Sequence, residues 1–175
     1  MDISFKMGDE KFNYRVSAII ISNGRILAMS HDKPSEYYSL PGGRVMMEET
    51  AEQAMIREVR EELHIDIEDA REMGVLNFSF ACGTIPEIRC HVFMATSFTG
   101  TPTETPEAEP FWCPVDGIPY DLMWQDDRFW LPAMLDGKRF EAFFTFEGDR
   151  MMEFSLKTGD CPGKEKQAPS ASPSL

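Results

Sequence analysis

Four glutamates at fixed spacings around one predicted loop and helix could support metal chemistry. Glu49 precedes the predicted helix, and Glu58, Glu61 and Glu62 lie within it. In a helix, residues three and four positions apart share a face, so the last three carboxylates lie together. Like charges at this spacing destabilise an isolated helix by roughly a few tenths of a kcal/mol per pair, and a cation would remove that repulsion. Carboxylate oxygens suit hard ions, Mg²⁺ first and Mn²⁺ second.

The alternative explanation of this acidic run is a solvated helix face, which is the commoner role of glutamate-rich segments. The preceding residues favour the metal site. Pro41, Gly42 and Gly43 predict a turn in which missing Cβ atoms let the backbone approach an ion or a phosphate. The fixed distance along the chain from this turn to Glu49 and Arg57 also argues against a chance acidic cluster.

Residues 50–63 predict the helix that carries these glutamates. Ala51, Met55, Val59 and Leu63 recur every fourth position as one apolar stripe, and neither glycine nor proline interrupts it. His64 follows directly. Histidine tolerates the left-handed backbone conformation that ends many helices better than most residues do.

This stretch resembles the sequence signature of the Nudix family. The family pattern starts at Gly43, continues through Glu49 and the pair Arg57-Glu58, and departs only at His64, where the family has a glycine. The resemblance implies an α+β Nudix fold, which is an α/β/α sandwich with a mixed central sheet.

The resemblance also implies roles for the acidic residues. Glu61 and Glu62 correspond to the main Mg²⁺ ligands, and Glu58 to a further ligand or the base that deprotonates water. The Gly43 carbonyl completes the metal shell. Glu107 matches a loop carboxylate of the metal site or the base, and a solvated loop acid is the equal alternative. Arg57 and Glu49 are expected to brace the loop against the helix through an ion pair.

A second region, residues 91–146, resembles the branch of MutT-like hydrolases that destroys oxidised purine nucleoside triphosphates such as 8-oxo-dGTP. In that branch a tryptophan stacks on the base and two aspartates bond to its edge, which assigns these roles to Trp124, Asp126 and Asp127. An indole offers a large stacking surface, and two adjacent carboxyls in a dry pocket do not both ionise, so the pair can accept and donate. The alternatives are a core tryptophan and a helix N-cap.

Two further positions match the nucleotide pocket of this branch. Phe78 matches an aromatic residue of the pocket wall, and a core phenylalanine is the alternative. Ser39 stands where relatives have an asparagine that bonds to the base. A hydroxyl has fewer hydrogen-bonding sites than an amide, so the preference between oxidised guanine and oxidised adenine stays open.

The acidic composition of the chain argues against binding to a nucleic acid polymer. The chain has 17 Lys and Arg against 30 Asp and Glu, for a formal charge of −13, so we expect a small nucleotide substrate and no nucleic acid polymer. No apolar run has the length of a membrane span, and the N-terminus lacks a signal peptide pattern, so the cytoplasm is the expected location. The cysteines form no metal-binding or disulfide pattern. Monomer and homodimer remain open.

The predicted organisation is one domain, residues 1–157, followed by a disordered tail, residues 158–175. Asn23-Gly24 predicts a hairpin turn between two apolar strands. We expect strands at residues 75–80, 87–96 and 111–115, a hairpin around Gly148, and a second helix at residues 126–135. Pro132 moves the expected start of that helix towards Leu131.

These observations predict Mg²⁺-dependent hydrolysis of a nucleoside triphosphate, with an oxidised purine as the expected base, to a monophosphate and pyrophosphate. One alternative keeps the chemistry and changes the substrate to ADP-ribose, a dinucleoside polyphosphate or an unmodified nucleotide. The other is a non-catalytic nucleotide sensor on the same fold. A sensor has no need of Glu58, Glu61 and Glu62 together.

Overall fold

The computed structural model describes residues 4–7, 10–32, 36–106 and 108–160. The strands are β1 (Ser4–Met7), β2 (Glu10–Ser22), β3 (Arg25–His31), β4 (Tyr37–Ser39), β5 (Gly42–Arg44), β6 (Asp66–Ile67), β7 (Arg71–Phe80), β8 (Glu87–Ala95), β9 (Phe98–Thr99), β10 (Glu109–Pro114), β11 (Lys138–Glu147) and β12 (Arg150–Asp160). The helices are α1 (Ala51–Leu63) and α2 (Asp127–Leu135), with a 3-10 turn, η1 (Tyr120–Leu122).

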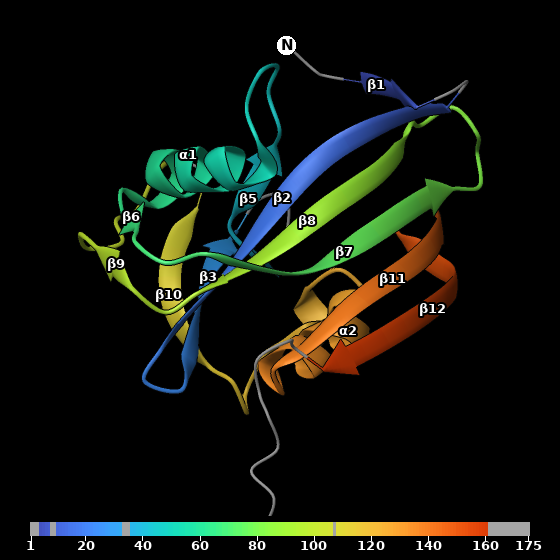
Figure 1. Ribbon diagram of the computed structural model, residues 1–175. Coiled ribbons are helices and arrows are strands. Elements are labelled where there is room, and N and C mark those ends of the chain that lie inside the picture. The colour runs from blue at the N-terminus through green and yellow to red at the C-terminus, as the bar shows by residue number, and fades with distance from the viewer. Residues whose placement is uncertain (1–3, 8–9, 33–35, 107, 161–175) are drawn as a thin grey trace, which may run out of the picture.

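Among the described residues, ten strands form one mixed sheet. Its main path runs β10-β3-β2-β8-β7-β11-β12, with β1 and β5 also paired to β2, and β4 to β3 (Figure 1). The β2–β8 and β7–β11 pairs are parallel, and the other pairs along this path are antiparallel. A separate two-stranded sheet joins β6 to β9. The predicted α+β class with a mixed central sheet is therefore confirmed.

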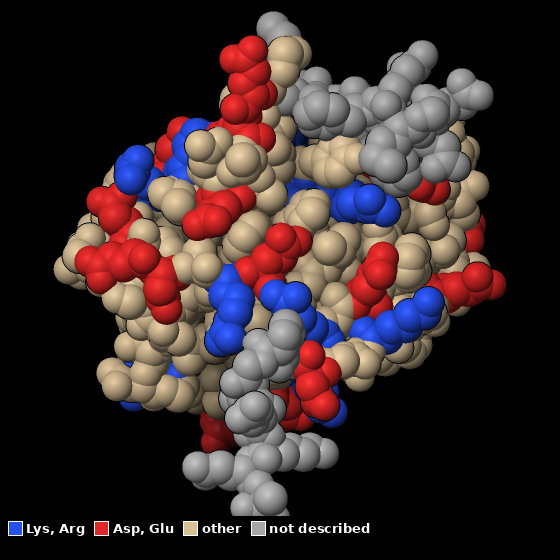
Figure 2. All heavy atoms as spheres, viewed as in Figure 1, with Lys and Arg blue, Asp and Glu red and all other residues tan. Residues whose placement is uncertain are grey.

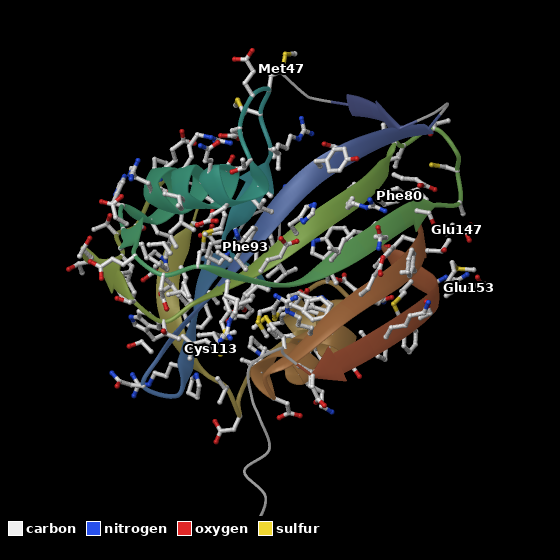
Figure 3. All side chains as sticks on the ribbon, viewed as in Figure 1. Met47, Phe80, Phe93, Cys113, Glu147 and Glu153 are labelled. Carbon is white, nitrogen blue, oxygen red and sulfur yellow. The ribbon has the colours of Figure 1, made fainter. Side chains whose placement is uncertain are left out.

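Strand β2 shows why the sheet has a helix on each side. Successive side chains of a strand point to opposite faces. Val16, Ala18 and Ile20 pack in one buried cluster with residues of α1, whereas Ile19 belongs to a second cluster with Trp130 of α2. Figure 1 shows α2 behind β11, and Figure 3 places Phe93 of the first cluster near α1. The result is a three-layer arrangement around one sheet.

Helix α1 begins and ends as its sequence predicts. Thr50 accepts a hydrogen bond from the Gln53 amide, and the Gln53 side chain accepts one from the Thr50 amide, which is a complete capping box. Met55, Val59 and Leu63 of the apolar stripe are buried. His64 closes the helix in the left-handed region, with φ 59° and ψ 33°, so it adopts the conformation that glycine has in the family.

The predicted second helix at residues 126–135 is confirmed to within one residue, but the alternative start near Leu131 was wrong. Helix α2 begins at Asp127 and contains Pro132 in its interior, so it does not start near Leu131. Pro132 is exposed, and burial of Trp130, Leu131 and Met134 offsets the hydrogen bond that a proline cannot donate.

The expected end of the domain at residue 157 falls inside β12. That strand continues to Asp160, which pairs with Lys138. Residues 161–175 lie outside the described part of the chain. The hairpin at Asn23-Gly24 formed as predicted, with φ angles of 52° and 70°. No helix within the described ranges is long and apolar enough to cross a membrane.

Candidate active site

The two glycines of the predicted loop bring the backbone close to β2 and α1. A Cβ atom at Gly42 would overlap the Val16 carbonyl of β2, and one at Gly43 would overlap the Glu58 carboxyl group. Gly42 also donates its amide hydrogen to Glu62 Oε2 over 3.2 Å. Only residues without a side chain allow this approach, so the loop places the Gly42 amide against Glu62 and the Gly43 backbone against Glu58.

Arg57 binds the loop to the helix. Its guanidinium donates two hydrogen bonds to Glu49, over 2.7 and 3.1 Å, and one to the Arg44 carbonyl over 2.9 Å. The Arg57 hydrogen bond lowers the pKa of Glu49, and the same bond raises the pKa of Arg57. The predicted brace is confirmed by this geometry.

The same guanidinium also contacts the catalytic candidates. Arg57 Nη1 lies 2.9 Å from Glu58 Oε1 and 3.2 Å from Glu61 Oε2. One arginine therefore offsets the repulsion between Glu58 and Glu61, a contact that the sequence interpretation missed. Arg60 points away from the trio, as expected, and pairs with Asp66 over 2.5 Å.

The chemistry of this donor set fits a hard divalent cation. Glu58 and Glu62 lie against the Gly42-Gly43 backbone, and Glu61 shares Arg57 with Glu58, so the ligand atoms that these residues offer are all oxygens. Within the described ranges, no three His, Cys, Asp or Glu side chains converge tightly enough to enclose an ion. Arg57 holds two of the carboxylates instead. Glu107 lies outside the described residues. Figure 2 shows acidic side chains gathered over α1 and the loop before it.

A pocket of about 370 Å³ opens beside this loop, on the α2 side of the sheet. It contains all five residues predicted to bind the base. The residues that line it are Arg15, Ser17, Ser39, Leu40, Leu76, Phe78, Phe80, Ile88, Cys90, Trp124, Asp126, Asp127, Trp130 and Phe146. Figure 3 marks Phe80 towards the end of β7. The segment from Ser39 to Gly43 connects the pocket to the glutamate trio.

Trp124 is not a core aromatic. Its exposed fraction is 57%, and its ring meets Phe146 edge-on with centroids 5.9 Å apart. The large exposed indole face makes it available for stacking at the pocket entrance. Phe78 is both a residue of the pocket wall and a core phenylalanine, because it lines the pocket and also packs against Phe144 and Phe146.

The two aspartates are almost completely buried, with exposed fractions of 4% for Asp126 and 8% for Asp127. Asp126 occupies the N-cap position of α2, but its side chain makes no capping bond and instead accepts one from Trp130 Nε1 over 3.0 Å. The N-cap interpretation is therefore wrong for its side chain. Burial raises the pKa of Asp126 to about 6, and burial together with the Asp126 charge raises the pKa of Asp127 well above its usual value.

Because both pKa values are raised, the buried pair resists double ionisation and favours a state that keeps one proton. Ser39 lies across the pocket, and its Oγ is 2.6 Å from His31 Nε2. The His31 ring stacks on Tyr37 at 4.4 Å, so the partner of the hydroxyl is itself fixed. The pocket thus combines a carboxylate, a protonated carboxyl and a hydroxyl within apolar walls.

The sequence interpretation assigned no role to several pocket residues, above all Arg15, Ser17 and Cys90. Arg15 and Ser17 alternate with Val16 and Ala18 in a central strand. Polar residues at alternate positions of an otherwise apolar interior strand were the available signal. Burial raises the pKa of the Cys90 thiol to about 12, so it stays protonated.

The raised pKa of Asp126 predicts a pH-dependent stability. A carboxyl whose folded pKa exceeds its unfolded value stabilises the fold below the unfolded pKa, and the contribution is lost as pH rises through the folded pKa. Between pH 4 and 7 we expect the free energy of unfolding of the wild type, relative to Asp126→Asn, to fall by about 2 to 3 kcal/mol. Urea unfolding at several pH values measures it. The exposed hairpin variant Asp149→Asn is the control, and a pH-independent difference for Asp126→Asn contradicts the assignment.

Comparisons with known proteins agree with this geometry. The family model for the NUDIX domain matches residues 11–134. The chain is 39% identical over 116 residues to the oxidized purine nucleoside triphosphate hydrolase of Danio rerio, which covers 66% of this chain and 74% of that protein. It is 35% identical over 120 residues to the mouse enzyme of the same name, covering 68% and 76% of the two chains.

A solved structure supports the fold independently. The MutT protein of Bacillus halodurans superimposes with a TM-score of 0.75 at 21% identity, covering 82% of this chain and 97% of the other. The extent of the family match, together with the glycine loop and the glutamates of α1, shows that the chain belongs to the Nudix family of hydrolases, which act on pyrophosphate bonds.

Proposed function

We propose that this protein hydrolyses an oxidised purine nucleoside triphosphate to a monophosphate and pyrophosphate in a Mg²⁺-dependent reaction. The observation that carries the proposal is the pocket in which Trp124, Asp126 and Asp127 meet beside the glycine loop. The names of the fish and mouse relatives support the same substrate class.

Recognition of the base depends on which pocket groups donate and which accept hydrogen bonds. Oxidation at the purine ring changes its tautomer, and therefore which edge atoms donate hydrogen bonds. A protonated Asp127 donates, whereas an ionised Asp126 accepts, so the pair complements an edge with both kinds of group. Ser39 supplies a third contact, and Trp124 stacks on the ring.

The hydrolytic end uses the glutamates of α1. Glu61 and Glu62, with the Gly43 carbonyl, would hold the cation. A bound divalent cation neutralises charge on the phosphate oxygens and favours ionisation of the attacking water. Glu58, held by Arg57 against Gly43, orients the water and takes its proton. Glu107 is a second candidate for the base.

A nucleotide panel tests the proposal. Purified protein with Mg²⁺ is incubated separately with 8-oxo-dGTP, an oxidised dATP, unmodified triphosphates, ADP-ribose and a dinucleoside polyphosphate, and the products are identified. We expect pyrophosphate and monophosphate from an oxidised purine triphosphate at the highest kcat/KM. Turnover of ADP-ribose without any pyrophosphate from oxidised purines would overturn the proposal, and tight nucleotide binding without any turnover would indicate a sensor.

Trp124→Ala isolates the stacking contribution. Loss of a base–aromatic stack costs about 1 to 3 kcal/mol, so we expect KM for a purine nucleotide to rise about 10-fold or more. Trp124→Phe keeps a smaller aromatic face and should recover part of the loss. Steady-state kinetics with purine and pyrimidine triphosphates provide the measurement. An equal effect on both nucleotide classes would show that Trp124 has another role.

A further inference from the structure

Arg15 contributes a charged side chain to the pocket wall, and it has no partner among the residues that the structure describes. It lies in the interior of β2 and is half-buried, and its guanidinium makes no hydrogen bond or ion pair with any residue that the structure describes. The other pocket-facing polar residue of this strand, Ser17, does have a partner, because its hydroxyl donates to the Pro41 carbonyl over 3.4 Å. Removing a guanidinium from water without a partner is unfavourable, so the position suggests a ligand.

Arg15 is also the only cation among the residues that line the pocket, and the other charged residues there are Asp126 and Asp127. The charges of all three residues influence the pKa of Cys90. The positive charge of Arg15 opposes the rise in the pKa of Cys90, whereas the two aspartates reinforce it. The pocket therefore combines a single positive charge with a carboxyl pair that keeps one proton.

The strand register places Arg15 between the two ends of the site. Across β2, Arg15 is opposite Cys90 of the pocket floor on one side and Arg44 of β5 on the other, and the next residue, Val16, is opposite Gly43. Because Gly43 contacts Glu58, Arg15 stands at the level where the pocket gives way to the hydrolytic loop. A nucleotide bound with its base in the pocket and its outer phosphates at the loop would have its first phosphate at this level.

We propose that Arg15 binds the first phosphate of the substrate, the one bonded to the nucleoside. The proposal rests on the proposed function, because it takes the base to lie between Trp124 and the aspartates. A guanidinium presents a rigid fork of donors that matches two phosphate oxygens, and such charge-assisted bonds are about twice as strong as neutral ones. By fixing the first phosphate beside the loop, Arg15 selects the anhydride bond that faces the glutamates, and the nucleoside leaves with one phosphate.

The test compares a nucleoside with its own monophosphate. Calorimetric binding of 8-oxo-deoxyguanosine and of 8-oxo-dGMP, without metal, is measured for the wild type, Arg15→Gln, Arg15→Lys and Arg25→Gln. Arg25→Gln is the matched control, because Arg25 is an exposed arginine at the far end of the hairpin and the charge change is the same. We expect Arg15→Gln to weaken monophosphate binding about 10-fold or more, since hydrogen bonds to charged groups contribute about 1.5 to 3 kcal/mol. Nucleoside binding should stay unchanged.

Arg15→Lys should keep part of the monophosphate affinity because it keeps the charge but loses the fork. Equal losses for nucleoside and monophosphate would overturn the proposal and indicate a base contact, and unchanged binding of both would also overturn it. Arg15→Met, which keeps much of the aliphatic stem, replaces Arg15→Gln in the comparison if the latter does not fold.

Failure of the proposed function is a separate result. If the wild type prefers an unmodified nucleotide, the oxidised purine assignment fails, yet the nucleoside and monophosphate of that preferred base still test Arg15. The salt dependence of binding gives a second readout. Removal of one phosphate contact should make monophosphate binding by Arg15→Gln less sensitive to salt than binding by the wild type.

Discussion

Glu61→Gln is expected to lower Mg²⁺-dependent kcat by about a thousandfold, because it removes a carboxylate charge that the proposed mechanism assigns to the binding of the cation. The fold should not change. The Glu61 side chain is 61% exposed, and its protein contact is the 3.2 Å bond from Arg57, which an amide oxygen can accept equally well. Pyrophosphate release at saturating nucleotide and a range of Mg²⁺ concentrations measures the effect.

Glu52→Gln is the matched control for this variant. Glu52 is an exposed glutamate in the first turn of the same helix, outside the trio, so the change in net charge is identical. It should retain normal turnover. Near-normal activity in Glu61→Gln with an unchanged melting temperature would refute the ligand assignment, and equal losses in both variants would attribute the effect to overall charge.

Asp126→Asn and Asp127→Asn are expected to differ strongly, although the two residues are adjacent. Burial raises the pKa of both carboxyls, and the Asp126 charge raises that of Asp127 further, so the proposed base reading has Asp126 accept as a carboxylate and Asp127 donate the shared proton. An amide replaces a protonated carboxyl closely, because both donate and accept, but it cannot replace a carboxylate. Loss of a buried charged partner costs about 2 to 5 kcal/mol, so Asp126→Asn should lower kcat/KM for the oxidised purine about 100-fold.

Asp127→Asn should cause a smaller loss of kcat/KM. Activity towards the unmodified triphosphate serves as the internal reference, since both variants keep the glutamates of α1. We expect the ratio of kcat/KM for oxidised over unmodified purine to fall most in Asp126→Asn. A larger fall in Asp127→Asn would show that the proton resides on the other carboxyl, and a uniform fall for all nucleotides would exclude base reading by this pair.

The sequence predicts the local elements well where local chemistry determines them. The hairpin at Asn23-Gly24 follows from its turn residues, helix α1 follows from its apolar stripe, and the shared face of the three glutamates follows from helical spacing. The short strands β4, β5, β6 and β9 were not predicted, because such brief elements depend on pairing partners from distant parts of the chain. The effect of Pro132 on the start of α2 was predicted wrongly for a similar reason. Packing of Trp130, Leu131 and Met134 against the sheet offsets the helix hydrogen bond that a proline cannot donate.

Part of the site was predicted, namely the residues that a sequence motif identifies. Trp124, Asp126 and Asp127 are neighbours in sequence, and motif resemblance identifies them. Arg15 and Cys90 reach the pocket only because β2 and β8 pair in parallel, which no local pattern shows. The threefold engagement of Arg57 with Glu49, Glu58 and Glu61 likewise depends on how the loop returns to the helix.

The alternation along β2 has a consequence for how such an enzyme can change its substrate. Arg15 and Ser17 face the pocket, whereas Val16 and Ala18 pack against α1. Substitutions at the pocket-facing positions can alter nucleotide preference while the glutamates stay in place. A single-residue insertion in this strand would exchange the two sets of side chains and disable both ends at once. Nucleotide preference can therefore change through substitutions in β2, whereas insertions or deletions in this strand are not tolerated.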